Sequence, residues 1–241
     1  MRKTAVLRND VFDKSAPFFG NFRLFRLVLV LAICMLLSAC FLKAEVGPPP
    51  AEPRSILVMD LRAPANYRKT DQEKTGWWFS ARTKYYNPWV GARCSDSVSQ
   101  QLASISYLLP YERNEFKICL SRKKDRLKRE FPGYSEDDYY DMLLAADPVG
   151  YARELQIDYI CTGEISDAYT SYHRFFQSMY SRVDARLELW DAKSGERVFN
   201  RDYKASALFA PQKDALDKLA AQVAKDLDRN FFRNLKNNGN Q

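Results

Sequence analysis

The fold is decided by one run of residues in which a helix leads directly into a strand: Ala152-Arg153-Glu154-Leu155-Gln156-Ile157-Asp158-Tyr159-Ile160-Cys161-Thr162-Gly163-Glu164-Ile165. Pro148 lies just before this run, and proline suits the first turn of a helix, so a helix is expected over 148–155. Residues 158–165 form a short apolar segment that predicts a buried strand. A helix followed by such a strand is typical of an α/β sheet.

Downstream of this run, the pattern changes to alternating polar and apolar residues. Segments 182–191 and 196–206 both alternate, and Lys193-Ser194-Gly195 between them predicts a hairpin. The last predicted element is a helix over 211–232 with an apolar stripe. The stripe is formed by Leu216, Leu219, Val223 and Leu227.

Upstream of the run, the predicted order is strand, helix, strand and further helices. Residues 55–61 predict the first strand, and a helix N-capped near Ser95 is expected to end at Pro110. The alternating segment 115–120 predicts the second strand, and helices are expected over 122–131 and after Ser135. The complete order is strand, helix, strand, helices, three strands and a helix. This order predicts an α/β fold with a mixed β-sheet flanked by helices.

The beginning of the chain has the features of an export signal. Six Lys or Arg residues precede the apolar run 27–37, and Leu37-Ser38-Ala39-Cys40 follows. The run is about 11 residues long, well short of the roughly 20 needed to span a bilayer. Leu-Ser-Ala-Cys resembles a bacterial lipobox, which implies cleavage before Cys40 and attachment of acyl chains such as palmitate to it. An ordinary secretory peptide or a membrane anchor is the alternative.

These features divide the chain into four segments. We expect a signal peptide over 1–39, a lipidated cysteine with a proline-rich tether over 40–54, a folded domain over 55–235 and a disordered tail over 236–241. Removal of the signal takes away six basic and two acidic residues and lowers the net charge from +7 to +3. The basic composition is therefore no reason to expect nucleic acid.

The order of elements resembles the CsgG-like periplasmic domain. That fold is shared by the curli secretion subunit CsgG, the penicillin-binding-protein activator LpoB and, more loosely, the N-terminal domain of TolB. The resemblance covers about residues 55–230. It rests on the segments 56–59, 116–122, 152–165 and 187–196, which are similar to the first strand, the second strand, the helix with its following strand, and the Asp-to-Gly-Glu hairpin of the family.

The resemblance implies a lipoprotein on the periplasmic face of the outer membrane, with the inner membrane as the alternative. Such a protein is a non-catalytic binding or assembly factor for an envelope machine of cell-wall synthesis or secretion. It is not an enzyme, it needs no cofactor beyond the covalent lipid, and its partners are the membrane and an envelope protein; self-association is left open. An export-channel subunit and an envelope hydrolase are the alternatives. Residues 166–182 fall short of a membrane hairpin, and the sequence shows no acid–base constellation.

Aromatic residues are dense in 62–92, which we expect to be a long loop that carries the partner site. The partner-binding candidates are Trp77, Trp78, Phe79, Tyr85 and Tyr86. Trp and Tyr are enriched in binding hot spots, and seven aromatic residues argue against disorder. The alternative is that the rings cover one end of the sheet. We expect Trp89 to be structural and the Trp77-Trp78 pair to bind.

The cysteines predict one disulfide. With Cys40 assigned to lipid, Cys94, Cys119 and Cys161 remain in an oxidising compartment, and two of these three are expected to pair. Which two pair is left open. The absence of a CxxC motif and the presence of a single histidine argue against a zinc or haem site.

Three further groups have simpler structural interpretations. His173, the single histidine, is expected on the surface. The acids Glu136, Asp137, Asp138 and Asp141 are expected to stabilise the first turn of a helix. The basic run 122–129 is interpreted as a solvated helix face with Leu127 and Phe131 buried, and contact with anionic lipid or an acidic partner is its alternative.

Overall fold

The computed structural model describes residues 48–50, 52–68, 72–77 and 81–234. The expected signal peptide, Cys40, Trp78, Phe79 and the tail 236–241 lie outside the described residues. The strands are β1 (Arg54–Val58), β2 (Gln72–Thr75), β3 (Arg82–Tyr85), β4 (Leu108–Pro110), β5 (Tyr159–His173), β6 (Ser178–Asp191) and β7 (Arg197–Leu208). The helices are η1 (Ala65–Arg68), α2 (Val90–Leu102), α3 (Arg113–Glu130), α4 (Glu136–Ala145), α5 (Pro148–Glu154), α6 (Gln212–Asp226), η3 (Leu227–Phe231) and η4 (Phe232–Asn234).

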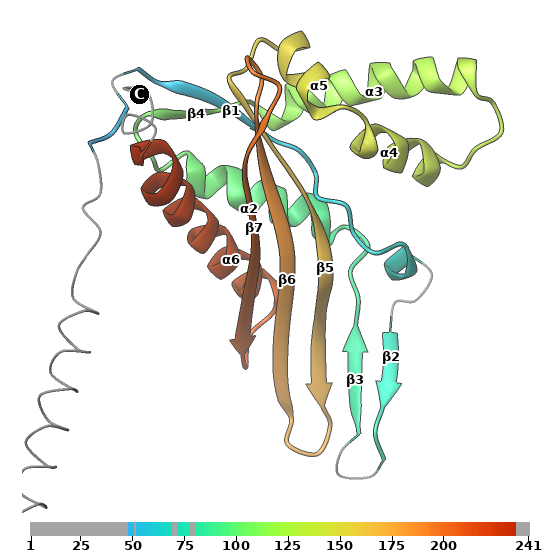
Figure 1. Cartoon of the computed structure of the whole chain (residues 1–241). Coiled ribbons are helices and arrows are strands. Elements are labelled where there is room, and N and C mark those ends of the chain that lie inside the picture. Colours follow the sequence, from blue (N-terminus) through green and yellow to red (C-terminus); the bar gives the residue numbers. More distant parts are fainter. Residues whose placement is uncertain (1–47, 51, 69–71, 78–80, 235–241) are drawn as a thin grey trace, which may run out of the picture. The chain divides into compact units, whose positions relative to one another are not determined.

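The strands form one mixed sheet with β5 at its centre (Figure 1). Along one edge, β5 pairs antiparallel with β6 over its whole length, and β6 pairs antiparallel with β7. Along the other edge, β5 pairs with parallel β1 near its start and with antiparallel β3 near its end. β4 extends the sheet beyond β1, and β2 extends it beyond β3. One edge of β5 therefore carries two separate pieces of sheet, and the predicted α/β fold with a mixed sheet flanked by helices is confirmed.

Helices α2 and α6 pack on one face of the sheet and bury the larger core. Apolar side chains of α2 recur every four residues and are all inaccessible to solvent: Val90, Cys94, Val98 and Leu102. They pack in one cluster with Ile56 and Val58 of β1, with Leu187 and Leu189 of β6, and with the apolar stripe of α6. The predicted stripe of the last helix is thus confirmed as a core face.

Helices α3, α4 and α5 cover only part of the other face. Leu57 and Met59 pack there with Phe116 of α3 and Tyr151 of α5, around the start of β5. Further along β5, β6 and β7, no helix of the described residues contributes to a core on this side. We call this uncovered side of the three strands the open face.

Two local features shape the long β5–β6 ribbon. A Cβ atom at Gly163 would lie 2.1 Å from the carbonyl oxygen of Arg186, so the close approach of the two strands requires glycine. A register shift between Ile165 and Asp167 marks a β-bulge, at which the alternation of side chains along β5 is reset. The bulge lets Ile165 and Ala168, three residues apart, both face the larger core.

The predicted strand over 115–120 is wrong, because these residues lie inside α3. Phe116 and Leu120 are buried, whereas Ile118 between them is exposed. The apolar side chains that pack are therefore four residues apart, which is the spacing of a helix rather than the spacing of two in a strand. The strand that follows the first long helix is instead β4, in which Pro110 lies at the edge of the sheet.

The predicted loop 62–92 is also wrong, since it contains η1, the hairpin β2–β3 and the start of α2. Helix α2 begins at Val90, so Ser95 is no N-cap. Its buried hydroxyl instead donates to the carbonyl of Met59 at 2.6 Å and accepts from the N–H of Leu61 at 3.2 Å. Residues 166–182, expected to separate two strands, are largely strand themselves and extend the β5–β6 ribbon.

The helix predicted to continue to Pro110 ends at Leu102, because Leu108–Pro110 pairs with β1 as β4, whereas the helix starts near Ser135 and Pro148 and the β6–β7 hairpin agree with the predictions. Ser135 forms a capping box with Asp138 at the start of α4, and Asp147 caps α5 just before Pro148. The hairpin β6–β7 turns at residues 192–196, where Gly195 has a φ of 78°. Within the described part of the chain, none of the helices has the length and apolar character that crossing a bilayer requires.

Candidate functional site

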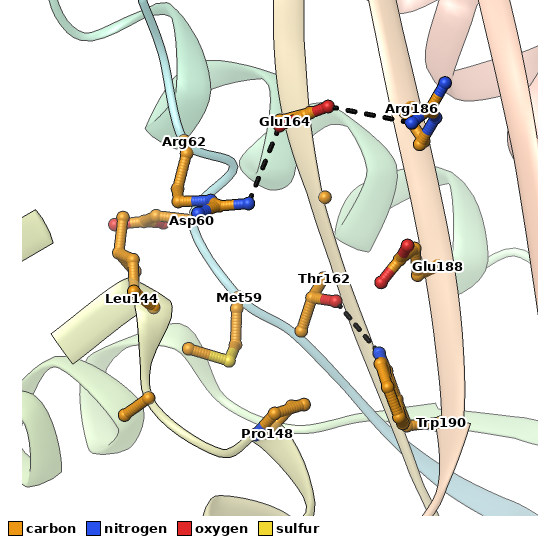
Figure 2. Close-up of a pocket in the computed structure, with 13 residues that line it drawn as sticks. Met59, Asp60, Arg62, Leu144, Pro148, Thr162, Glu164, Arg186, Glu188 and Trp190 are labelled. Carbon is orange, nitrogen blue, oxygen red and sulfur yellow. Dashed lines mark hydrogen bonds and ion pairs between the residues drawn. The ribbon is translucent and has the colours of Figure 1, made fainter. Parts of the chain in front are cut away.

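The open face carries a groove where it meets the connection between α4 and α5 (Figure 2). The groove encloses about 350 Å³. Met59, Leu144 and Trp190 lie at its floor, where Met59 and Leu144 are buried and Trp190 is partly exposed, and its rim is charged. The indole N–H of Trp190 donates to the hydroxyl of Thr162 at 3.2 Å, which fixes the ring on the floor.

Carboxylate and guanidinium groups alternate along the rim. Arg62 lies 3.5 Å from Glu164 and Arg186 lies 3.9 Å from the same carboxylate, as the dashed lines in Figure 2 show. Arg186 also donates from Nε to Asp202 at 2.9 Å, and this hydrogen bond raises the pKa of its guanidinium. The side chains of Arg62, Glu164 and Arg186 are about half exposed. Because the two contacts to Glu164 are long and exposed, they can open for an incoming charged group at small cost.

A buried ion pair fixes the helices against the sheet beside the groove. Asp60 follows β1 and accepts hydrogen bonds from Arg113 of α3 and from the hydroxyl of Tyr140 in α4. Arg113 also donates to the carbonyl of Val58 at 2.7 Å. Burial alone would lower the pKa of Arg113, but the facing carboxylate of Asp60 raises it. The buried pair therefore ties α3 and α4 to the end of β1.

Two of the carboxylates that line the groove are paired with arginine side chains. Glu164 and Glu188 both face guanidinium groups, the latter through Arg197 at 2.8 Å. Among the described residues, no group of three His, Cys, Asp or Glu side chains is placed to hold a metal ion. The geometry of the groove suits binding of a charged segment.

His173 lies at the end of β5 and is buried, so its predicted place on the surface is wrong. Its Nδ1 accepts a hydrogen bond from the backbone N–H of Phe176 at 3.3 Å, and its ring packs 4.7 Å from the ring of Phe176. The imidazole therefore organises the turn between β5 and β6. This position explains the burial of a polar ring near the tip of a hairpin.

The acidic cluster and the basic run have structural contacts. Asp138 belongs to the capping box of α4, and Glu136 forms salt bridges with Lys124 and Lys128 of α3. These two salt bridges hold α3 and α4 side by side and lower the pKa of Glu136. The interpretation of the acids as helix-end residues is confirmed. Phe131, expected to be buried, is exposed at the end of α3.

The five aromatic partner-binding candidates separate into three groups. Trp77 is 85% exposed at the end of the β2–β3 hairpin, and Tyr85 of β3 is also exposed. Tyr86 is instead structural: its ring stacks on Tyr67 with centroids 4.7 Å apart. Burial and the hydrogen bond from its hydroxyl to Glu73 raise the pKa of Tyr86 to about 12. Trp78 and Phe79 lie outside the described residues, and binding by Trp77 and Tyr85 stays a prediction.

Trp89 contradicts its expected structural role, because 64% of it is exposed just before α2.

Other exposed apolar residues were missed by sequence analysis. Phe175 and Phe176 lie in the turn between β5 and β6, and Leu208 and Phe209 lie at the end of β7. Two adjacent Phe residues inside a polar turn are the signal that could have found the first pair. No comparable sequence signal marks the charged residues of the groove rim, since alternating charges are typical of any solvated strand face.

The predicted disulfide does not form in this structure, in which Cys94, Cys119 and Cys161 are free thiols. Cys94 and Cys161 lie in the larger core, whereas Cys119 packs on the opposite side of the sheet. The sheet therefore separates Cys119 from the other two. Burial raises the pKa of Cys94 and of Cys161 to about 12, which makes both thiols unreactive.

Comparisons with known proteins give a likeness of fold only. No protein-family profile and no curated protein match the chain. Among solved structures, the PelC dodecamer from Paraburkholderia phytofirmans is 13% identical with a TM-score of 0.45 and covers 76% of this chain and 94% of that chain. Lipoprotein GNA1162 from Neisseria meningitidis is 14% identical with a TM-score of 0.38, covering 73% and 98%. The LpoB C-terminal domain from Escherichia coli is 11% identical with a TM-score of 0.32, covering 71% and 93%. All three TM-scores are below 0.5, so these likenesses carry no argument about what the chain binds.

Proposed function

We propose that this chain is a lipid-anchored factor on the periplasmic face of the outer membrane, without catalytic activity or a bound cofactor. It binds a protein of an envelope machine through the groove on the open face. The signal segment and the lipobox-like Leu37–Cys40 support the anchor. The resemblance of the chain to CsgG-like domains supports the location and the class of partner.

The observation that carries this proposal is the groove, with its apolar floor residues and its half-exposed charged rim. The floor offers an anchor point for an apolar side chain, and apolar anchors in pockets dominate binding energies. The rim offers both signs of charge within one patch, at Arg62, Glu164 and Arg186. A protein segment that presents an apolar side chain flanked by acidic and basic residues is complementary to this surface.

Crosslinking in cells tests the proposed partner site. A photoreactive amino acid is placed at Glu188 on the groove and, as the matched control, at exposed Arg129 on α3. We expect one protein to be crosslinked from the groove position and not from the control. The double variant Arg62→Ala/Arg186→Ala should weaken that crosslink at least tenfold while its melting temperature stays near that of the wild type. Equal labelling from both positions, or hydrolysis of cell-wall material by the purified protein, contradicts the proposal.

The proposed anchor is tested separately. Cells fed labelled palmitate should incorporate the label into the wild-type protein and not into the Cys40→Ser variant. The variant should accumulate as uncut precursor or appear in the soluble fraction. Label in the Cys40→Ser variant contradicts lipidation at this residue.

A further inference from the structure

The β2–β3 hairpin, the β5–β6 hairpin and β7 all extend away from the end of the sheet where β1 begins, and β7 ends short of the β5–β6 turn (Figure 1). Arg82 of β3 pairs with His173 of β5, so the start of β3 lies beside the end of β5. Leu208 of β7 pairs with Tyr180 of β6, and the N–H of Phe209 donates to the carbonyl of Met179 at 2.7 Å. The sheet register therefore sets these three segments side by side.

Large apolar side chains project from all three segments. We call this set the aromatic tip, and its members, with exposed fractions, are Trp77 (85%), Phe175 (60%), Phe176 (67%), Leu208 (69%) and Phe209 (78%). The rings of Phe175 and Phe176 are 5.1 Å apart in an edge-to-face contact. A monomeric protein gains nothing in stability from such exposure, so a concentration of exposed apolar side chains indicates an interaction surface.

The segments that carry the aromatic tip contain charged residues of one sign only, although Arg182, Lys204 and Lys213 pair with carboxylates outside these segments. Residues 74–85, 168–183 and 203–213 contain no Asp or Glu. The same segments contain Lys74, Arg82, Lys84, Arg174, Arg182, Lys204 and Lys213. The chain as a whole has 37 basic and 30 acidic residues, so a complete lack of acids in three converging segments is a local property.

Three of the carboxylates that border these segments accept hydrogen bonds from other side chains of the protein. Glu73 accepts from the hydroxyl of Tyr86 at 2.7 Å, and Asp167 accepts from the hydroxyl of Tyr67 at 3.1 Å. Asp184 accepts two hydrogen bonds from Arg182, at 2.9 and 2.6 Å. An approaching anionic surface therefore meets apolar rings first and basic side chains next.

We propose that the aromatic tip inserts into the interface of a bilayer that contains anionic lipid. Aromatic rings are favoured at the boundary between headgroups and acyl chains, and nearby Lys and Arg side chains add attraction to anionic lipid. A bilayer interface suits the aromatic tip, because side chains at the end of a sheet can enter a fluid interface without a preformed pocket. A protein partner would need a matching concave surface. This inference stands on the aromatic tip alone and does not depend on the groove.

The proposed anchor at Cys40 is compatible with this contact. Strand β5 has 15 residues, so at about 3.3 Å per residue it carries the tip about 50 Å from the end of the sheet where β1 begins. The 14 residues from 40 to 53 span about 43 Å when extended at about 3.1 Å per residue. The two lengths are similar. A domain lying along the membrane can thus hold both contacts on one surface.

Quenching of tryptophan fluorescence by lipid tests the insertion. The protein purified from cell membranes is reconstituted into vesicles of phosphatidylglycerol and phosphatidylcholine, with and without bromine on the acyl chains. Bromine quenches only nearby indoles, and Trp77 at the tip is the reporter. For the wild type, we expect strong quenching on vesicles that contain phosphatidylglycerol and weaker quenching on pure phosphatidylcholine. Added salt should progressively reduce the quenching on the anionic vesicles.

Two variants make this test specific. Phe175→Asp with Phe176→Asp places acids at the tip and should reduce quenching at least threefold. Phe131→Asp with Tyr134→Asp changes two exposed aromatic residues after α3 and should leave quenching unchanged. Unaltered far-ultraviolet circular dichroism and melting temperature confirm that both variants fold. Equal quenching in all three proteins, or no quenching in the wild type, overturns the proposal. A specific protein crosslinked from Phe176 in place of lipid overturns it as well.

Discussion

The inner and outer parts of the β5–β6 ribbon are built from the same two strands but differ in what surrounds them. In the inner part, Leu187 and Cys161 are buried beneath α2 and α6. In the outer part, beyond the paired core residues Ala168 and Val183, the side chains of Tyr172, Phe175 and Phe176 are exposed. The inner part gains its stability from packing, whereas the outer part is held by the strand ladder, by buried His173 and by its neighbour β3.

This difference separates the residues that hold the fold from those that are free to bind. Substitutions in the inner part remove packing and reduce the free energy of unfolding. Substitutions at the tip of the outer part expose no new surface and leave stability intact. The boundary lies just beyond the paired residues Ala168 and Val183, which are the last core residues of the two strands on the far side of the bulge. The two parts can therefore be tested separately by mutation.

The largest expected effect is at Gly163 in the inner part. A Cβ atom there would lie 2.1 Å from the carbonyl oxygen of Arg186, and two paired strands cannot move apart without losing their hydrogen bonds. Gly163→Ala should lower the free energy of unfolding by about 4 kcal/mol or more. Urea unfolding followed by circular dichroism measures the change. Gly133→Ala is the control, since no atom lies within 4 Å of its Cβ position, and its positive φ of 107° costs only about 1–2 kcal/mol. Equal losses in the two variants would contradict the close-approach argument.

A cavity in the same part should have a slightly smaller effect. Leu187 is fully buried, and Leu187→Ala removes its packing against the larger core. We expect a loss of about 3 kcal/mol in the free energy of unfolding, from lost transfer energy and an unfilled cavity. The matched substitution Leu208→Ala, at the end of β7, should cost less than about 0.5 kcal/mol. An equal loss in the free energy of unfolding for Leu187→Ala and Leu208→Ala would contradict this comparison.

High pH should destabilise the inner part through its thiols. Burial raises the pKa of Cys94 and Cys161 to about 12, whereas a thiol in the unfolded chain titrates at about 8.5. The folded state binds these protons more tightly, so the contribution is complete below about pH 8.5 and is lost as pH rises towards 12. At about pH 10 the loss is of the order of 1–2 kcal/mol per thiol.

Melting temperatures recorded between about pH 7 and pH 10 test this dependence. The wild type should melt at progressively lower temperature above about pH 8.5, and Cys161→Ala should weaken the decline. Burial and the hydrogen bond to Asp226 also raise the pKa of Tyr203. Tyr203 therefore contributes to the same loss of stability at high pH, and it does so in the Cys161→Ala variant as well. An identical decline in Cys119→Ala and Cys161→Ala would show that the thiol burial does not control it.

The smallest stability effect is expected at the aromatic tip. The double variant Trp77→Ala/Phe176→Ala removes two exposed rings and should change the free energy of unfolding by less than about 0.5 kcal/mol. Binding to anionic vesicles through the tip should nevertheless fall at least tenfold. A variant that melts far below the wild type would show that the rings cover the end of the sheet.

The overall α/β order could be predicted from sequence because the deciding segments have strong local signals. Asp147 with Pro148 starts α5, and the apolar residues after Asp158 form the buried start of β5. Segment 115–120 predicts a strand because Phe116, Ile118 and Leu120 are spaced two residues apart, although Ile118 is exposed on the helix. Its exposure is set by tertiary packing, which the local pattern does not contain.

The hairpin β2–β3 could not be predicted for a different reason. All four residues of β2 are exposed and polar, so no hydrophobic alternation marks the strand. The hairpin is ordered by its pairing with β5, a contact between residues about 90 positions apart. The same applies to the groove, whose rim joins Arg62 with Glu164 and Arg186 only after folding. Exposed Trp77 was the part of the tip that composition alone could indicate.

The shared edge of β5 makes the β2–β3 hairpin a replaceable module. The hairpin meets the rest of the sheet through four residue pairs, between Arg82–Tyr85 and Thr170–His173, whereas β1 occupies a different stretch of that edge. Insertions and deletions between η1 and α2 can therefore change the length and chemistry of the tip without disturbing β1 or the helices packed on it. Homologous chains should diverge fastest in this segment. Hairpins transplanted between them should carry their membrane or partner preference to the new host.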